Sequence, residues 1–140
     1  MKKLGIIGFG WLGNHIAERL SGQYEIFATT TTPSKAENLN AKGYHTTLVE
    51  MKASKSAADL DAIIISVPFS GIRGAQIPMN DKRQNLLNFL GDFKGQLFLA
   101  SSTGVYPDTE KEFTEDDLDS QDVESESFIL EKFPKTNILR

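Results

Sequence analysis

Three glycines near the N-terminus have the spacing of a phosphate-binding turn. Gly8, Gly10 and Gly13 follow a short apolar stretch and precede a segment with helical periodicity. The first glycine permits a sharp exit from a strand, and the missing Cβ of the second lets a pyrophosphate approach the backbone. The third lets a helix lie close to the strand, and the helix start offers N–H groups and a positive dipole end to phosphate oxygens. The pattern therefore predicts a dinucleotide site made by Gly8, Gly10, Trp11, Leu12 and Gly13.

Hydroxyl side chains follow the next apolar segment, at residues 29–32. NAD-preferring sites usually have Asp or Glu there, to accept hydrogen bonds from the ribose. In this sequence no carboxylate would repel a 2′-phosphate, whereas Thr29, Thr30, Lys35 and the start of the following helix could bind one. We therefore expect NADP to be favoured over NAD. No arginine offers a bidentate contact, so NAD stays an alternative, and the threonines could also be only strand-end and capping residues.

Alternating strands and helices must position these groups. Besides the strand before Gly8, the pattern predicts strands at 24–29, 44–49, 61–67, 96–100 and 135–139. A helix is expected after the glycine turn, with Leu12, Ile16 and Leu20 on one face beside Ala17. A second helix is expected to start with a Thr32 cap and Pro33 and to stop at Gly43. Further helices are expected at 54–60, from an Asn80 cap to about residue 91, and at 125–133. The apolar residues at 61–67 do not alternate, as in a strand with helices on both faces.

This order of elements predicts an α/β fold, a three-layer Rossmann domain with a mostly parallel, doubly wound sheet of order 3-2-1-4-5-6. Its ligand is expected at the carboxyl ends of the strands, near the switch point between strands 1 and 4. We therefore also expect the cofactor to contact residues at the ends of strands 4 and 5, namely Ser66, Val67, Pro68 and Ser101.

Composition limits the alternatives. The chain has 140 residues, enough for one domain, and a net charge of -4, which argues against a general nucleic-acid binder. It has no cysteine for a disulfide or thiolate metal site and only 2 histidines, so no metal is expected. The longest apolar run, 62–67, is too short to span a bilayer, and we expect a cytoplasmic protein without a membrane partner. Nothing in the sequence indicates an oligomeric state.

Segment 108–126 is strongly acidic, with only Lys111 opposing its carboxylates. We predict a solvated surface loop; a cation or partner site is the alternative. The acidic residues are Asp108, Glu110, Glu112, Glu115, Asp116, Asp117, Asp119, Asp122, Glu124 and Glu126.

The glycine turn, the two threonines at 29–30 and the sequence Ser-Ser-Thr-Gly-Val-Tyr at 101–106 together resemble the extended short-chain dehydrogenase/reductase superfamily. Within it, the chain is most similar to atypical NAD(P)-dependent epimerase/dehydratase-like proteins. The resemblance implies that Ser102 hydrogen-bonds a substrate oxygen and that Lys132 is the lysine of a Tyr-x-x-x-Lys motif. The tyrosine position of that motif holds Phe128, which cannot donate a proton.

The resemblance also implies that a substrate domain follows the Leu-Arg at 139–140, so that residues 1–140 are the NAD(P)-binding domain alone, as a cut or a naturally shortened protein. Its expected function is that of an NAD(P)-dependent epimerase/dehydratase or reductase acting on a small or sugar-like carbonyl substrate. The alternatives are a catalytically silent dinucleotide-binding sensor or scaffold, and a β-hydroxyacid-dehydrogenase-like cofactor domain, whose corresponding strand also ends in Val-Pro, as at 67–68.

Overall fold

A single parallel sheet organises the chain in the computed structural model, which describes residues 1–48, 57–67, 79–102, 106, 109–120 and 123–140. Its 6 strands have the order β3-β2-β1-β4-β5-β6, and each neighbouring pair is parallel. The predicted doubly wound Rossmann topology is therefore confirmed. The strands are β1 (Lys2–Ile7), β2 (Tyr24–Thr30), β3 (His45–Leu48), β4 (Ala62–Ile65), β5 (Gln96–Ala100) and β6 (Asn137–Leu139).

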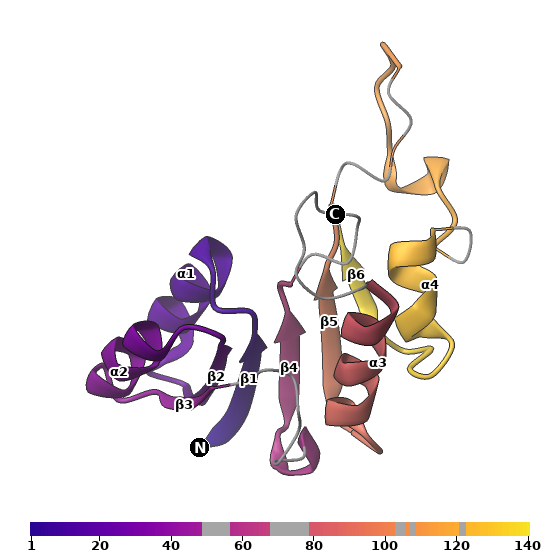
Figure 1. Cartoon of the computed structure of the whole chain (residues 1–140). Coiled ribbons are helices and arrows are strands. Elements are labelled where there is room, and N and C mark those ends of the chain that lie inside the picture. Colours follow the sequence, from indigo (N-terminus) through magenta and orange to yellow (C-terminus); the bar gives the residue numbers. More distant parts are fainter. Residues whose placement is uncertain (49–56, 68–78, 103–105, 107–108, 121–122) are drawn as a thin grey trace.

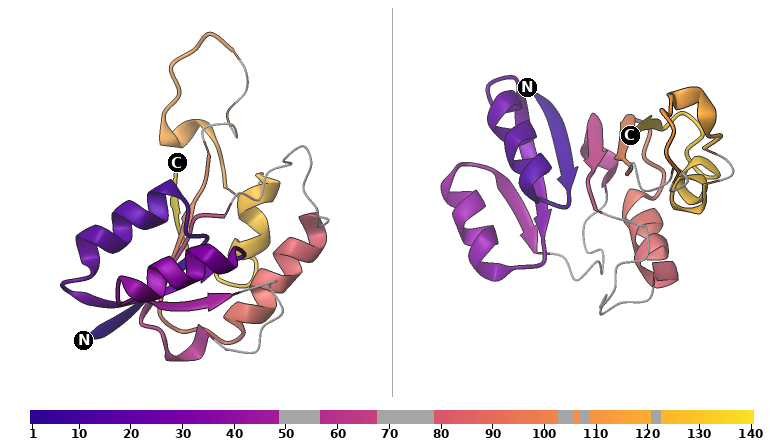
Figure 2. Two further views of the ribbon diagram at one scale, coloured as in Figure 1. Left: turned by 60° about the vertical axis from the view of Figure 1, so that its left-hand side comes forward. Right: turned by 90° about the horizontal axis from the view of Figure 1, so that it is seen from above.

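Helices cover both faces of this sheet. In Figures 1 and 2, α1 (Trp11–Leu20) and α2 (Pro33–Ala41) lie on one side, and α3 (Met79–Leu90) and α4 (Glu124–Leu130) lie on the other. Two short 3₁₀ turns, η1 (Ala57–Asp59) and η3 (Glu115–Asp117), lie between longer elements. The strands all end at one edge of the sheet, at the top of Figure 1, and residues 109–120 rise beyond that edge.

Two apolar clusters, one on each face, hold these layers together. Leu4, Ile6, Ile26 and Ala28 pack with residues of α1 and α2 on the first face. On the second face, residues of β4 and β5 pack with α3 and α4, including Ile63, Ile65, Leu86, Leu90, Leu99 and Ile129. Because β4 faces both clusters, all of its residues are apolar, as expected for a strand covered on both sides.

The start of α1 differs from the prediction. Leu12 was expected on the buried face, but it is 39 % exposed, and the buried positions are Gly13 and Ala17. The helix meets the sheet instead through Gly13, where a Cβ would lie 3.0 Å from Ile6 Cγ2, and through Ala17 in the first cluster. Ile16 and Leu20 do pack against the first cluster, as predicted.

Most other boundaries lie within a few residues of the predictions. Asn80 is an exception, because α3 begins at Met79 and Asn80 is inside the helix instead of capping it. The helix expected at 54–60 is present only as the short η1 turn, while residues 54–56 and Val49 lie outside the described residues. Pro33 is the first residue of α2, and Gly43, at φ +86°, follows its end as expected.

Two kinds of feature are absent from the described residues. None of the helices found there is both long enough and apolar enough to cross a membrane. Within the same ranges, no three His, Cys, Asp or Glu side chains are grouped so that they could hold a metal ion.

Candidate functional site

The glycine turn begins with an unusual peptide at Gly8. Its φ of +85° is a conformation that L side chains rarely adopt, and a Cβ at this position would overlap the side chain of Val67. The Gly8 N–H donates to Thr29 Oγ1 at 3.1 Å, and its carbonyl oxygen accepts a hydrogen bond from the Gly10 N–H at 3.0 Å. The chain therefore turns sharply where β1 ends, as the sequence predicts.

The other two glycines serve different purposes. A Cβ on Gly13 would lie 3.0 Å from Ile6 Cγ2 and 3.1 Å from the Gly8 carbonyl oxygen, so this glycine lets α1 approach β1 closely. Gly10 has φ -88° and ψ -153°, which any residue can adopt, and a Cβ there would meet no atom of the described residues within 4 Å. Neither backbone strain nor packing within the described residues therefore calls for glycine at position 10.

The N-terminus of α1 is open in the same place. Gly10 is its N-cap residue and has no side chain to accept a hydrogen bond, and the first turn contains no acidic residue. The first N–H groups of a helix have no partner within the helix, and they lie at the positive end of its dipole. The turn therefore presents main-chain donors beside an unobstructed glycine, an arrangement suited to a phosphate group.

Strands β2 and β4 place polar groups on either side of this turn. Thr29 and Thr30 are the last residues of β2, and Lys35 lies half-buried in the first turn of α2. Thr30 Oγ1 accepts a hydrogen bond from the Thr32 N–H at 3.2 Å. Ser66, which follows β4, donates its hydroxyl hydrogen bond to the Gly8 carbonyl oxygen. Val67 is next to Gly8, whereas Pro68 lies outside the described residues.

The residues expected from the end of β5 have different surroundings. The Ser101 N–H donates to the Leu139 carbonyl oxygen at 2.7 Å, and its hydroxyl donates to Glu126 Oε1 at 2.6 Å. Ser102, the next residue, is exposed. Ser101 thus belongs to the carboxyl edge of the sheet, but its hydroxyl proton is directed to α4 and not to the glycine turn.

Ser102 and Lys132 are not brought together. Helix α4 leads from the carboxyl end of β5 back to the amino end of β6, because these neighbouring strands are parallel (Figure 1). Lys132 follows the end of α4 and is exposed, with its Nζ 5.7 Å from the centre of the Phe133 ring. It is therefore at the far end of the crossover from Ser102. The Phe128 ring lies 5.3 Å from the Arg83 guanidinium and packs against the second apolar cluster.

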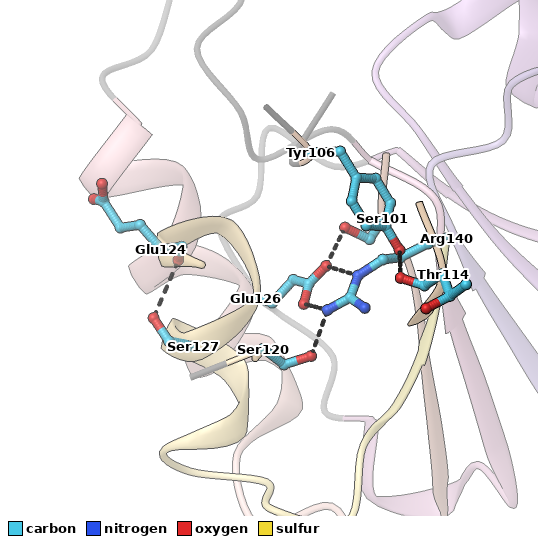
Figure 3. A network of polar contacts seen from close by, with 8 residues as sticks. All are labelled: Ser101, Tyr106, Thr114, Ser120, Glu124, Glu126, Ser127 and Arg140. Carbon is cyan, nitrogen blue, oxygen red and sulfur yellow. Dashed lines mark hydrogen bonds and ion pairs between the residues drawn. The ribbon is translucent and has the colours of Figure 1, made fainter. Parts of the chain in front are cut away.

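One buried ion pair was missed by the sequence analysis. Glu126 was counted in the solvated acidic segment, but it is 0 % exposed and pairs with Arg140, whose side chain is 11 % exposed (Figure 3). Arg140 donates from Nε to Glu126 Oε1 at 3.0 Å, from Nη2 to Oε2 at 2.8 Å, and from Nη2 to Ser120 Oγ at 2.8 Å. The signal was the spacing of Glu126 from Ile129 and Leu130, which places all three on the buried face of α4.

The ion pair is well compensated. Burial alone would raise the pKa of Glu126, but hydrogen bonds from Arg140, Ser101 and Ser120 and the charge of Arg140 bring that pKa below its usual value. Glu126 is therefore a carboxylate at neutral pH. Tyr106 lies beside the pair, with its ring 5.9 Å from the Arg140 guanidinium, and its hydroxyl donates to the Thr114 carbonyl oxygen at 3.3 Å.

Comparison with known proteins identifies a family through the N-terminal part of the chain. The model of the family described as NADP oxidoreductase coenzyme F420-dependent matches residues 3–87, which include the glycine turn and the ends of β2 and β4. No curated protein matches the sequence.

Solved structures with the same fold include three with different functions. UDP-N-acetylglucosamine 4-epimerase from Bacillus cereus is 17 % identical, with a TM-score of 0.65 over 100 % of this chain and 60 % of that protein. The TrkA-N domain of the inner membrane protein YbaL from Escherichia coli is 11 % identical, with a TM-score of 0.59 over 99 % of this chain and 86 % of that one. Yeast methylglyoxal/isovaleraldehyde reductase Gre2, solved with NADPH, is 19 % identical, with a TM-score of 0.57 over 74 % of this chain and 38 % of that one.

These likenesses show a shared fold and no more. The chain spans 60 % of the epimerase and 38 % of the yeast reductase. The coarser part of the predicted resemblance, an NAD(P)-binding Rossmann domain of the oxidoreductase type, agrees with the family match. These matches do not distinguish atypical short-chain dehydrogenases from other proteins with this fold, so the membership of this chain in that group stays a proposal.

Proposed function

The chain belongs to the family described as NADP oxidoreductase coenzyme F420-dependent, and from this premise we propose that it binds NADP(H) at the glycine turn. The bound diphosphate lies over Gly10 and accepts hydrogen bonds from the first amides of α1. The observation that carries this proposal is the space beside Gly10, where neither the backbone conformation nor any atom of the described residues calls for glycine. A ligand that must approach the main chain accounts for a glycine at such a position.

NADP is favoured over NAD by the residues after β2. The segment 29–35 contains hydroxyl groups and Lys35 but no carboxylate, and Lys35 is in the first turn of α2. A 2′-phosphate placed there would meet a positive side chain and the positive end of a helix dipole. Thr29 and Thr30 stand at the same edge of the sheet.

Calorimetric titration of the purified chain with NADP⁺ and with NAD⁺ tests both parts of the proposal. We expect both cofactors to bind, and NADP⁺ to bind more tightly, because only NADP⁺ has a phosphate for Lys35 to pair with. Tighter binding of NAD⁺ would overturn the cofactor preference. Binding of neither cofactor would overturn the site itself.

A variant of Gly10 separates ligand approach from folding. Gly10→Val should fold normally, since its Cβ meets no atom of the described residues, and it should abolish cofactor binding by blocking the diphosphate. Gly22→Val is the matched control, because a Cβ at Gly22 also meets no atom of the described residues and Gly22 lies in the turn after α1. Retained binding in Gly10→Val would show that the diphosphate lies elsewhere.

The chemistry performed with the cofactor has two candidates. One is an epimerase/dehydratase or reductase reaction on a small or sugar-like carbonyl, with Ser102 exposed at the carboxyl edge to bind a substrate oxygen. The other is a catalytically silent cofactor-binding module. The second is favoured by Phe128 and Lys132, since Phe128 has no phenol and packs beside Arg83, while Lys132 is at the far end of α4 from Ser102.

A further inference from the structure

Both main-chain groups of Gly8 are held by side chains from the strands on either side of β1. Its N–H donates to the Thr29 hydroxyl at 3.1 Å from β2, and its carbonyl oxygen accepts from the hydroxyl of Ser66, which follows β4. The Ser66 N–H also donates to the Ile7 carbonyl oxygen at 2.8 Å, so Ser66 is fixed to the end of β1 by its backbone as well. The two hydroxyl contacts thus hold the peptide groups before and after the Gly8 Cα, one each.

The conformation of Gly8 is one that benefits from such support. Gly8 stands at φ +85°, and glycine has the greatest conformational freedom to lose when it is held in one state. The Gly8 carbonyl oxygen also accepts from the Gly10 N–H at 3.0 Å, so its orientation sets the position of the second glycine and of the N-cap of α1. A side chain that fixes the Gly8 peptide therefore fixes the direction of the amides that follow.

The number of protons on each hydroxyl limits what else it can do. A serine hydroxyl has one proton, and that of Ser66 is directed to the Gly8 carbonyl oxygen. Ser66 therefore cannot donate to a phosphate at the same time. Thr29 uses an oxygen lone pair for the Gly8 N–H, and its own proton is not required by that contact. Ser66 therefore supports the turn and does not donate to a phosphate. Whether Thr29 also donates its proton to a phosphate is a question that an experiment can decide.

We infer that Thr29 and Ser66 are positioning residues, which hold the Gly8 peptide in its ligand-binding orientation before the cofactor arrives. They act through the glycine turn and not through contact with the ribose phosphate. The inference rests on the proposed function, because it concerns the same site. Its physical basis is preorganisation: a turn that is already ordered loses less entropy when the diphosphate binds.

The test compares NADP⁺ and NAD⁺ affinities of Thr29→Val and Ser66→Ala by calorimetry. Because both cofactors contain the same diphosphate, each variant should weaken both by a similar factor, about three- to tenfold for one lost hydrogen bond. The ratio of the two affinities should stay at its wild-type value. Thr29→Ser, which keeps the hydroxyl, should restore binding.

Thr46→Val is the matched control for the change from threonine to valine. The Thr46 Oγ1 is buried and has no hydrogen-bond partner within the described part of the chain, so its removal should leave both affinities unchanged. Circular dichroism establishes which variants are folded, and if Thr29→Val does not fold, Ser66→Ala and Thr29→Ser carry the comparison.

Each remaining result decides against the inference in a different way. A loss confined to NADP⁺ in Thr29→Val would make Thr29 a direct phosphate contact. Wild-type affinities in both variants would remove any positioning role. If the wild-type chain binds neither cofactor, the proposed function fails and the inference with it, whereas the first two results leave the proposed function standing.

Discussion

Glu126 illustrates how a single buried charge is accommodated. Both of its carboxylate oxygens accept hydrogen bonds from Arg140, and Oε1 also accepts from Ser101 (Figure 3). These contacts connect the end of β5, the end of β6 and, through Ser120, the segment that rises beyond the sheet. Removing one partner of a buried pair costs far more than the pair contributes in total, because the other charge is left without compensation.

We expect Glu126→Gln to lower the free energy of unfolding by roughly 3 to 5 kcal/mol, measured by urea denaturation at pH 7. Glutamine has a similar shape, but it leaves the guanidinium of Arg140 in a mostly buried position without a negative partner. Glu18→Gln is the matched control: Glu18 pairs with Lys42, and both side chains are about half exposed (50 % and 49 %), so this change should cost less than about 1 kcal/mol. Equal costs in the two variants would contradict the importance of burial.

The pH dependence of the free energy of unfolding gives a second measurement of what Glu126 contributes to stability. The pKa of Glu126 is lower in the folded chain than the usual glutamate pKa of about 4.3, so the folded state binds its proton less readily. The contribution to stability is therefore fully present above that usual pKa and is lost as the pH falls through the folded pKa. The glutamine variant should lose less stability than the wild-type chain between pH 7 and acid pH.

At the scale of elements, the corner between β1 and α1 depends on a close approach. Gly13 lies inside this contact, with Ile6 and the Gly8 carbonyl oxygen as neighbours of the absent Cβ. At Gly10, three residues earlier, a Cβ would meet no atom of the described residues. Two glycines of one motif therefore have separable roles, one in packing the helix and the other in admitting the ligand.

Gly13→Val should separate these roles. The added side chain must push α1 away from β1, and overpacking of this kind costs about 1 to 3 kcal/mol in the free energy of unfolding. Cofactor affinity should fall as well, because the amides at the helix start move with α1. Urea denaturation and calorimetry on the same samples check this, and a stable Gly13→Val with normal affinity would show that the close approach is not required.

At the scale of the whole molecule, local signals in the sequence sufficed for the fold. Pro33 and Gly43 mark the ends of α2, and the apolar residues of β4 indicate a strand covered on both faces. The handedness of parallel crossovers then leaves few possible strand orders, and the observed order is the one predicted. The glycine turn was predictable for the same reason, since its three glycines are close in sequence.

What the sequence could not supply was pairing between distant residues. Arg140 and Glu126 are brought together by the packing of α4 against the sheet, and acidic neighbours conceal Glu126 in a segment that reads as solvated. The support of Gly8 by Ser66 depends likewise on β4 lying next to β1, because Gly8 and Ser66 are 58 positions apart in the chain. The exposure of Leu12 follows from which residues of α1 meet the sheet, which periodicity does not encode.

The chain as a whole is also expected to catalyse little NADPH-dependent reduction of carbonyl compounds. We expect the chain to oxidise NADPH at negligible rates with small aldehydes, ketones or nucleotide sugars, measured by absorbance at the nicotinamide band. The expected proton donor is replaced by Phe128, and the hydroxyl of Tyr106 donates to the Thr114 carbonyl oxygen. Rapid turnover with a carbonyl compound would show that another group supplies the proton, and turnover with coenzyme F420 alone would indicate hydride exchange between cofactors.

Trp11 has a practical consequence. It is the first residue of α1, it is 79 % exposed, and its ring meets that of His15 edge-on with 4.5 Å between their centres. Because the chain contains 1 tryptophan, the intrinsic fluorescence excited in the indole band arises from this corner alone. The protein thus carries its own optical probe of the helix start, with no label to attach and no second emitter to subtract.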